Sequence, residues 1–348
     1  MTRRYFFDLD LNELKGYFAA EGVKPFRAGQ LMHRVYLLGT HDPALMTEFS
    51  AEVRARLAAD FDFSLPEPVE SRKSSDGTVK LLLRLADGQE VETVLIPDEE
   101  RLTQCISTQA GCAMGCAFCR TASGGLARHL TSGEMAGQVL SGEKHGGFNR
   151  RVTNIVFMGM GEPLHNLDNT VKAFDLFTSA WGFGLGRRRI TVSTCGLVEE
   201  IGKLPERMLP SLAVSLNATT DAQRSAIMPV NRRYPLAELV GALSRLKWPS
   251  RERLTIEYVL LGGLNDTPAD AKRLVRLLSG VRCKINLIPY NPHGESEFSA
   301  PSPDAVEAFQ GYLLDHGLVA VKRASRGADI LAACGQLKAE KTQEPRRR

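Results

Sequence analysis

The sequence predicts an α/β protein whose core is a partial (β/α)6 barrel. From residue 102 onward, short apolar segments alternate with helical stretches, a pattern typical of parallel sheets. Six such repeats are fewer than the eight of a closed (β/α)8 barrel, so we expect a barrel open on one side that admits a bulky substrate. Two other patterns precede these repeats and predict a small helical N-terminal domain and a short β-hairpin extension.

Residues 1–65 carry apolar side chains at helical spacing and predict the N-terminal accessory domain. A third helix is expected over residues 50–60, before the break at Pro66 and Pro68. The first two helices are marked by apolar stripes, which we expect to form the core of this domain: Leu14, Tyr17 and Phe18, then Leu31, Val35 and Tyr36.

Residues 66–97 predict a β-hairpin that links this domain to the barrel. Two strand-like runs, 78–85 and 90–96, are joined by Asp87-Gly88, a pair that suits a tight turn. Glu92 interrupts the second run, on the face that also carries Val94 and Ile96. The alternation places this carboxylate either at a solvated edge or facing a cleft, and the sequence leaves both open.

Residues 98–337 contain the barrel and a C-terminal segment. Thr131-Ser-Gly-Glu134 has the form of a capping box and predicts the start of the first helix between strands. A late strand is expected at 318–322. The six apolar segments predicted as barrel strands are 102–107, 154–158, 189–193, 212–216, 255–261 and 284–288.

Composition indicates a soluble globular enzyme, with 43% hydrophobic and 24% charged residues in a chain of 348. No apolar run reaches the roughly 18 residues that a membrane span needs, and the N-terminus lacks the pattern of a signal peptide. We therefore expect a cytoplasmic protein with no membrane association, whose seven cysteines stay reduced and serve as metal ligands, catalytic thiols or buried residues.

The net charge of +4 is only mildly basic, but arginines cluster in several places. Such clusters either bind phosphates through forked hydrogen bonds or simply form solvated faces. We expect residues 338–348 to form a disordered basic tail. The clusters are Arg150-Arg151, Arg187-Arg188-Arg189, Arg232-Arg233, Arg323 with Arg326, and Arg346-Arg347-Arg348.

The sharpest motif is Cys112-Ala-Met-Gly-Cys116-Ala-Phe-Cys119, in which three cysteines lie within eight residues. Structural zinc usually takes four ligands in paired knuckles, and no second knuckle occurs in the chain. Three thiolates on a 4Fe-4S cube would leave one iron open for a cofactor. The CxxxCxxC spacing resembles the signature of radical S-adenosylmethionine (SAM) enzymes.

Polar and glycine residues follow the predicted strands, at the sheet edge where α/β enzymes carry their chemistry. Gly161 lets the protein backbone come close to a cofactor, and Glu162 is suited to its ammonium group. Short polar side chains are suited to a ribose and a carboxylate, although each alone is equally well read as a turn or cap residue. These are Ser193, Ser215 and Asn291.

Four cysteines lie outside the loop. Cys195 and Cys283 are most simply buried packing residues. Cys105 lies in the first barrel strand and Cys334 in Ala332-Ala333-Cys334-Gly335-Gln336, and the residues alone do not pair them.

Three stretches together resemble the RlmN/Cfr family of radical SAM methyltransferases, which methylate adenosine in RNA. They are Cys105 to Cys119, Met158-Gly-Met-Gly-Glu-Pro163, and Gly327 to Leu337 with its C-terminal cysteine. The likeness extends over nearly the whole chain. In one departure, Ser215-Leu216-Asn217 stands where many relatives have Ser-Leu-His; asparagine can exchange hydrogen bonds but cannot ionise as histidine does.

The resemblance implies roles for matching residues. Cys112, Cys116 and Cys119 would hold one 4Fe-4S cluster, Cys334 would carry the methyl group, Cys105 would be its partner thiol, and Glu92 would accept a proton. The implied SAM contacts are Gly161, Glu162, Ser193, Ser215, Leu216, Asn217 and Asn291.

The resemblance also implies the reaction. One SAM methylates Cys334, a second gives a 5′-deoxyadenosyl radical, and the activated S-methyl group adds to C2 of an adenosine in 23S rRNA or tRNA. Attack by Cys105 then leaves a disulfide, which a reductant resets. Two SAM molecules are consumed in each turnover, the electron donor would be a flavodoxin or ferredoxin, and the enzyme would act as a monomer.

Three alternatives remain at this point. Methylation at C8 of the same rRNA adenosine, which confers antibiotic resistance in the Cfr subgroup, uses the same residues. A zinc-containing RNA-binding protein would need the cysteine loop but no catalysis. A radical SAM enzyme acting on a small molecule or peptide would need the cluster but not Cys334.

Overall fold

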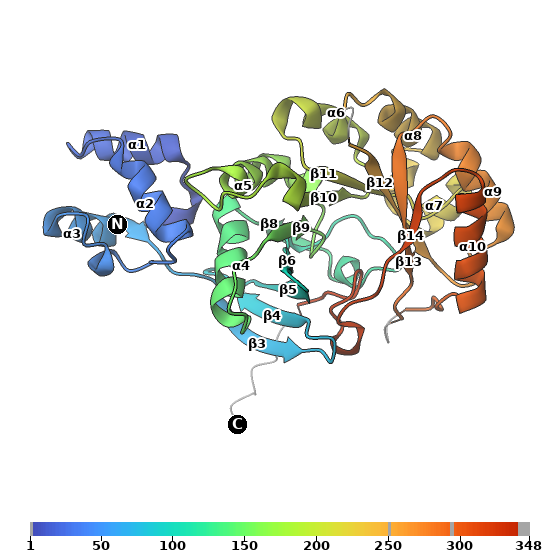
Figure 1. Cartoon of the computed structure of the whole chain (residues 1–348), viewed down its shortest axis with the longest axis horizontal. Coiled ribbons are helices and arrows are strands. Elements are labelled where there is room, and N and C mark those ends of the chain that lie inside the picture. Colours follow the sequence, from blue (N-terminus) through green and yellow to red (C-terminus); the bar gives the residue numbers. More distant parts are fainter. Residues whose placement is uncertain (1–2, 250–251, 293–295, 340–348) are drawn as a thin grey trace.

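The computed structural model describes residues 3–249, 252–292 and 296–339. Within these residues the centre is a ten-stranded sheet that runs from β14 at one edge to β3 at the other (Figure 1). Each of its parallel strands is hydrogen-bonded to the next one along the chain. The parallel strands are β6 (Arg101–Cys105), β9 (Asn154–Phe157), β10 (Ile190–Thr194), β11 (Ser211–Ser215), β12 (Leu254–Leu260), β13 (Cys283–Pro289) and β14 (Ala320–Lys322).

Helices connect the parallel strands and lie around the outside of the curved sheet (Figure 1). The two edge strands, β14 and β3, do not pair with each other, so the barrel is open. This confirms the predicted α/β fold with a partial barrel. The connecting helices are α4 (Ser132–His145), α5 (Leu167–Thr178), α6 (Val198–Arg207), α7 (Asp221–Ile227), α8 (Leu236–Arg245), α9 (Pro268–Leu277) and α10 (Pro303–Asp315).

The predicted capping box begins α4. The Thr131 side chain accepts a hydrogen bond from the Glu134 N–H at 3.1 Å, and the Glu134 carboxylate accepts one from the Thr131 N–H at 2.9 Å. No helix in the described part of the chain is both long and apolar enough to cross a membrane. Residues 340–348, which include most of the predicted basic tail, lie outside the described residues.

The predicted hairpin is present as β4 (Val79–Arg84) and β5 (Glu90–Asp98), with Gly88 in the left-handed region at φ +82°. β5 also pairs antiparallel with β6, so the hairpin continues the barrel sheet. A further strand, β3 (Glu67–Lys73), extends this antiparallel edge. The sequence did not predict it, because its side chains are mostly exposed and polar and lack an apolar alternation.

The N-terminal helices pack beside α4 and α5 (Figure 1). Leu14, Phe18 and Leu31 of the predicted stripes are fully buried. The Asp8 carboxylate accepts a hydrogen bond from the Gly133 N–H at 2.9 Å, which ties this region to the start of α4. The region contains α1 (Leu11–Ala20), α2 (Arg27–Tyr36), α3 (Ala51–Asp60) and the paired short strands β1 (Arg4–Tyr5) and β2 (Phe61–Asp62).

Smaller elements complete the described chain. β7 (Gln109–Gly111) pairs with β8 (Leu126–His129) and closes the base of the cysteine loop. The short 3-10 turns are η1 (Phe6–Asp8), η2 (Pro43–Leu45), η3 (Arg120–Gly124), η4 (Pro163–Asn166), η5 (Arg187–Arg189), η6 (Pro229–Arg232) and η7 (Ala328–Ile330).

Candidate active site

The cysteine loop folds over the carboxyl ends of the parallel strands. Gly111 has φ +84°, and a side chain there would overlap the Gly125 carbonyl oxygen, so only glycine allows the loop to close on itself. The Cys112 N–H donates to that carbonyl at 2.8 Å, and the Ala117 N–H donates to the Ile227 carbonyl at 2.9 Å. These bonds hold the loop against α7.

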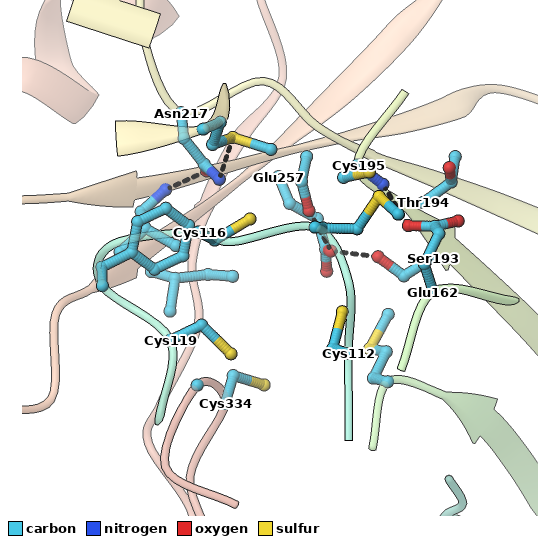
Figure 2. A pocket seen from close by; sticks show the side chains of 18 of the residues that line it. Cys112, Cys116, Cys119, Glu162, Ser193, Thr194, Cys195, Asn217, Glu257 and Cys334 are labelled. Atoms are coloured by element: carbon cyan, nitrogen blue, oxygen red, sulfur yellow. Dashed lines mark hydrogen bonds between the residues drawn. The ribbon is translucent and has the colours of Figure 1, made fainter. Parts of the chain in front are cut away.

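Cys112, Cys116 and Cys119 line one cavity, as predicted (Figure 2). In the described part of the chain, no three cysteine, histidine or acidic side chains form a group able to hold a single metal ion. Zinc would need its sulfurs gathered about 2.3 Å from one point. A 4Fe-4S cube binds each thiolate through a different iron, so its ligands stay apart. Three cysteines that line one cavity suit a 4Fe-4S cube, which three thiolates can hold with one iron left open.

The loop after β9 supplies the next wall of this cavity. Gly161 has φ +103°, and a Cβ atom there would lie 2.6 Å from the Gln109 Cβ, so the position requires glycine. The buried Glu162 carboxylate accepts hydrogen bonds from the Cys195 N–H at 2.7 Å and the Leu164 N–H at 3.0 Å. Burial raises the pKa of Glu162. Its carboxylate is thus fixed at the cavity wall.

The remaining predicted cofactor residues come from three further strand ends. Ser193, Ser215, Asn217 and Asn291 line the same cavity as the three cysteines. The Leu216 side chain is fully buried, and Leu216 does not line the cavity. Its N–H donates to the Glu257 carbonyl at 2.9 Å and its carbonyl accepts from the Arg224 guanidinium at 3.0 Å, so the structure does not bring this residue to the cavity.

Glu257 on β12 also lines this cavity, and sequence reasoning missed it. Its carboxylate accepts a hydrogen bond from the Ser193 hydroxyl at 2.7 Å, and its side chain is only 7% exposed. Arg323 lies 3.6 Å from its other oxygen. A carboxylate within the apolar run 255–261 was the signal that could have identified it.

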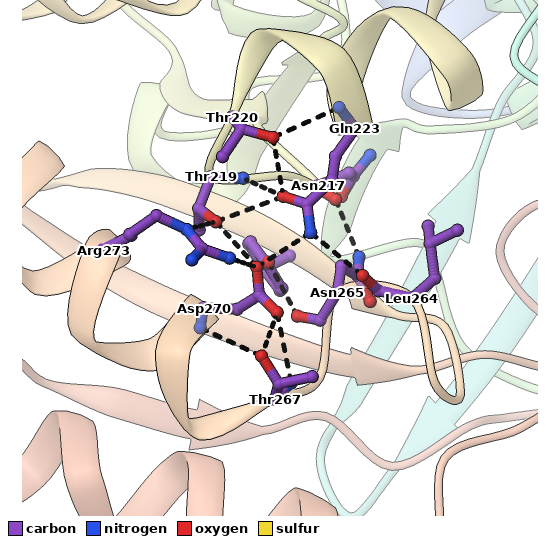
Figure 3. Close-up of polar contacts among 10 residues, drawn as sticks. Asn217, Thr219, Thr220, Gln223, Leu264, Asn265, Thr267, Asp270 and Arg273 are labelled. Carbon is purple, nitrogen blue, oxygen red and sulfur yellow. Dashed lines mark hydrogen bonds and ion pairs between the residues drawn. The ribbon is translucent and has the colours of Figure 1, made fainter.

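Asn217, the departure from the family pattern, adopts a left-handed backbone with φ +57°. Asparagine and histidine are both enriched in this conformation, so the backbone accepts either residue. The Asn217 side-chain oxygen accepts a hydrogen bond from the Val259 N–H at 2.8 Å, and its carbonyl accepts one from the Asn265 amide at 2.7 Å. A polar network around Asp270 supports this loop from behind (Figure 3).

A second cavity adjoins the first. Cys105, Arg323 and Arg326 line the second cavity only, whereas Cys334 lines both. Met158, Ile288 and Asn291 are also shared, so the two spaces are contiguous at Cys334. The fold therefore brings together Cys105 and Cys334, which are remote in sequence.

The two thiols differ in environment. Cys105 is buried, and burial raises its pKa to about 12, with a further contribution from Cys334 and an opposing one from Arg323. Cys334 is exposed. Glu92 lines neither cavity; it is buried in an ion pair with Lys80, 2.8 Å from the Lys80 ammonium.

An open α/β barrel with three loop cysteines facing a cavity at its strand ends defines the radical SAM class of enzymes. Accordingly, residues 106–278 match the model of the radical SAM superfamily, and residues 6–62 match the model of the ribosomal RNA large subunit methyltransferase N-terminal domain. The chain belongs to the RlmN family of radical SAM methyltransferases.

Similar proteins extend over nearly the whole chain. A dual-specificity RNA methyltransferase RlmN from Syntrophotalea carbinolica is 49% identical, over 96% of this chain and 90% of the relative. One from Geobacter sulfurreducens is 50% identical, over 95% and 91%. The crystal structure of a radical SAM methyltransferase from Sphaerobacter thermophilus superposes with a TM-score of 0.92 at 44% identity, over 97% of this chain and all of that one.

Proposed function

We propose that this protein methylates C2 of adenosine in 23S rRNA and in tRNAs, through a methyl group carried on Cys334. The observation that carries the proposal is the position of Cys334, which lines both the cavity of the cluster loop and the adjoining cavity of Cys105. A residue that first receives a methyl group and then presents it to a base needs access to both spaces.

Cofactor binding is assigned to the first cavity. Cys112, Cys116 and Cys119 would hold a 4Fe-4S cluster, which when bound supplies the electron that cleaves SAM to the 5′-deoxyadenosyl radical. Glu162 and the backbone at Gly161 suit the SAM ammonium, and polar residues of the strand ends suit its carboxylate and ribose. These further contacts are assigned to Ser193, Ser215, Asn217 and Asn291.

Cys334 acts first, as a nucleophile. Its sulfur bonds to the methyl carbon of one SAM, and the sulfonium bond of that SAM breaks. Such a relay is needed because C2 of adenine is electron-poor and does not attack the sulfonium itself. A second SAM is consumed when hydrogen is removed from the S-methyl group and the carbon adds to C2.

Cys105 then resolves the adduct. The adduct would then lose its C2 proton to Glu92 and its unpaired electron to a one-electron acceptor, which restores the aromatic ring. The Cys105 sulfur bonds to the Cys334 sulfur, and the bond from Cys334 to the methylene carbon breaks. The methylene carbon takes a proton and leaves as methyladenosine. The resulting disulfide needs a two-electron reductant before the next cycle.

The substrate must enter the second cavity as an unstacked base, because stacking hides the ring carbon. Arg323 and Arg326 line this cavity and are suited to the phosphates beside the target nucleotide. We assign residues 1–65 to RNA binding as an accessory domain, 66–97 to a hairpin extension and 98–337 to the catalytic core. A monomer that receives electrons from a flavodoxin or ferredoxin in the cytoplasm completes the proposal.

The test is anaerobic methylation of ribosomal RNA and tRNA with labelled SAM, followed by mass spectrometry of the nucleosides. We expect 2-methyladenosine in both RNAs. Exclusive formation of 8-methyladenosine would overturn the proposed methylation at C2, although the relatives described above favour C2. Iron and sulfide analysis checks the cofactor: about four of each per chain are expected for a cube, and one zinc without sulfide would refute the proposal.

A further inference from the structure

Lys80 and Glu92 form a buried ion pair in the hairpin next to the second cavity. Lys80 lies on β4 and Glu92 on the adjacent β5, the Lys80 ammonium is 2.8 Å from the Glu92 carboxylate, and both side chains are 7% exposed. Buried ion pairs are expensive to desolvate, and apolar replacements of similar volume are often neutral or stabilising. Packing therefore does not account for this pair.

Both members of the pair also hold the segment that carries Cys334. The Lys80 ammonium donates to the Leu331 carbonyl at 3.1 Å, and the Glu92 carboxylate accepts from the Lys338 N–H at 2.8 Å. These two attachment points lie on either side of Cys334 in the sequence. The pair thus fixes both ends of residues 331–338, which we call the Cys334 segment.

The same geometry places Glu92 directly behind the wall of the second cavity. Ile96, on the same face of β5 as Glu92, lines the cavity. Leu337 also lines it, and the N–H of the next residue is the one bonded to Glu92. The carboxylate is therefore separated from the cavity only by the segment that it holds.

The charge on Glu92 links the attachment of the Cys334 segment to the proton transfer. Burial raises the pKa of Glu92, while Lys80, the Lys338 N–H and Arg120 oppose this effect. Protonation of Glu92 removes the counter-charge of Lys80 and weakens the hydrogen bond from Lys338. A proton that arrives on Glu92 would thus loosen the attachment at Lys338, while the Lys80 ammonium keeps its bond to the Leu331 carbonyl.

We propose that Lys80 is a positioning residue for the proton transfer: it holds Glu92 ionised at the cavity wall and couples arrival of the proton to release of the Cys334 segment at Lys338. The inference rests on the proposed function and adds a residue and a sequence of events to it. The C2–H bond of the adenine adduct on Cys334 breaks, its proton binds a Glu92 oxygen, and its electron pair stays with the adduct, while the unpaired electron left by the radical addition passes to a one-electron acceptor. The loosened segment then gives Cys105 access to the Cys334 sulfur.

The test uses the full-length protein with its reconstituted cluster and the Lys80→Met variant. Three products are measured: S-methylation of Cys334 by peptide mass, the covalent protein–RNA adduct on denaturing gels, and methyladenosine. We expect Lys80→Met to methylate Cys334 and form adduct as the wild type does, but to release methyladenosine about tenfold more slowly, so that the adduct accumulates. Lys80→Arg, which keeps the charge, should restore part of the release.

Two further variants separate this role from a structural one. Lys80→Met/Glu92→Gln leaves no buried charge; it should accumulate no more adduct than Glu92→Gln alone, because Lys80 acts through Glu92. Asp329→Ala removes another attachment of the same region, to the Ser74 hydroxyl at 2.6 Å, without touching Glu92, and should accumulate no adduct.

The outcomes distinguish the two proposals. A wild-type protein without S-methyl-Cys334 or methyladenosine refutes the proposed function. A normal wild type with fast product release by Lys80→Met refutes the role of Lys80. If Lys80→Met lacks Cys334 methylation as well, or if the double variant is slower than Glu92→Gln, Lys80 serves folding and the inference is wrong.

Discussion

The two contiguous cavities are built from different parts of the fold. Loops and strand ends of the parallel sheet surround the cluster cavity, and glycines at positions 111 and 161 fix two of those loops. The second cavity combines β5 and β6 with residues 323–337 near the end of the chain. The barrel supplies most of the proposed radical-forming site, with Cys334 and Gly335 added from the end of the chain, whereas the proposed methyl-carrying site also needs the antiparallel extension. Substitutions in the two cavities should therefore have separable effects.

The largest effect is expected from Cys112→Ala, because it removes one of three proposed cluster ligands. Iron and sulfide should fall far below the wild-type content, and neither S-methyl-Cys334 nor methyladenosine should form. Colorimetric iron and sulfide analysis with nucleoside mass spectrometry measures both. Full iron content together with full activity would remove Cys112 from the cluster.

Cys334→Ala should abolish methyladenosine while the cluster is retained, since only the methyl carrier is lost. Its iron content and its cleavage of SAM to 5′-deoxyadenosine, followed by liquid chromatography, serve as the internal control. Undiminished activity on a small molecule would instead support a different radical SAM reaction.

Cys105→Ala should stop the reaction one step later, with Cys334 bonded to the RNA. We expect a covalent protein–RNA band on denaturing gels that nuclease digestion reduces to a nucleotide-sized mass on the peptide of Cys334. Clean turnover by this variant would show that Cys105 is not the resolving thiol.

The thiols of the second cavity should react differently with iodoacetamide in the RNA-free protein. With a pKa of about 12, only about one part in ten thousand of Cys105 is thiolate at pH 8, and the residue is also buried. Cys334 is exposed, so peptide mass spectrometry should find it alkylated well before Cys105. Rising pH should favour Cys105 labelling, and equal labelling of both at pH 8 would contradict the described burial.

The smallest effect is expected from Ser193→Ala, which removes one hydrogen bond to Glu257 and one proposed polar contact to SAM. Loss of a neutral hydrogen bond costs about 0.5–1.5 kcal/mol, so the KM for SAM should rise about two- to tenfold. The fraction of adduct that is resolved to product should not change, because that step belongs to the second cavity. An altered fraction would show that the cavities are coupled through Glu257.

The sequence predicted most of the barrel because its parallel strands are continuous apolar runs, and each predicted strand lies within a few residues of the observed one. It also predicted the wall of the cluster cavity, since the carboxyl ends of parallel strands meet at one edge. It did not predict β3 (Glu67–Lys73), whose mostly exposed residues show no alternation of apolar and polar side chains.

The sequence also could not predict which side chains contact one another between strands. Glu257 could have been noticed as a lone carboxylate in an apolar strand, but its contact with Ser193 depends on the strand order. The same holds for Lys80, whose pairing with Glu92 follows from hairpin register, and whose bond to Leu331 joins positions 251 residues apart. Only the resemblance to a family, and not the spacing of residues, related Cys105 to Cys334.

The attachments of the Cys334 segment have a consequence for synthesis of the protein. Ser74, Lys80 and Glu92 meet their partners across separations of 255, 251 and 246 residues. Chains fold from the N-terminus as the ribosome extends them, so the helices, the hairpin and most of the barrel can form before Cys334 has been translated. The proposed methyl carrier is therefore the last of the proposed catalytic groups to be installed, and on this proposal a prematurely terminated chain would have the cysteine loop but no means of transferring a methyl group to RNA.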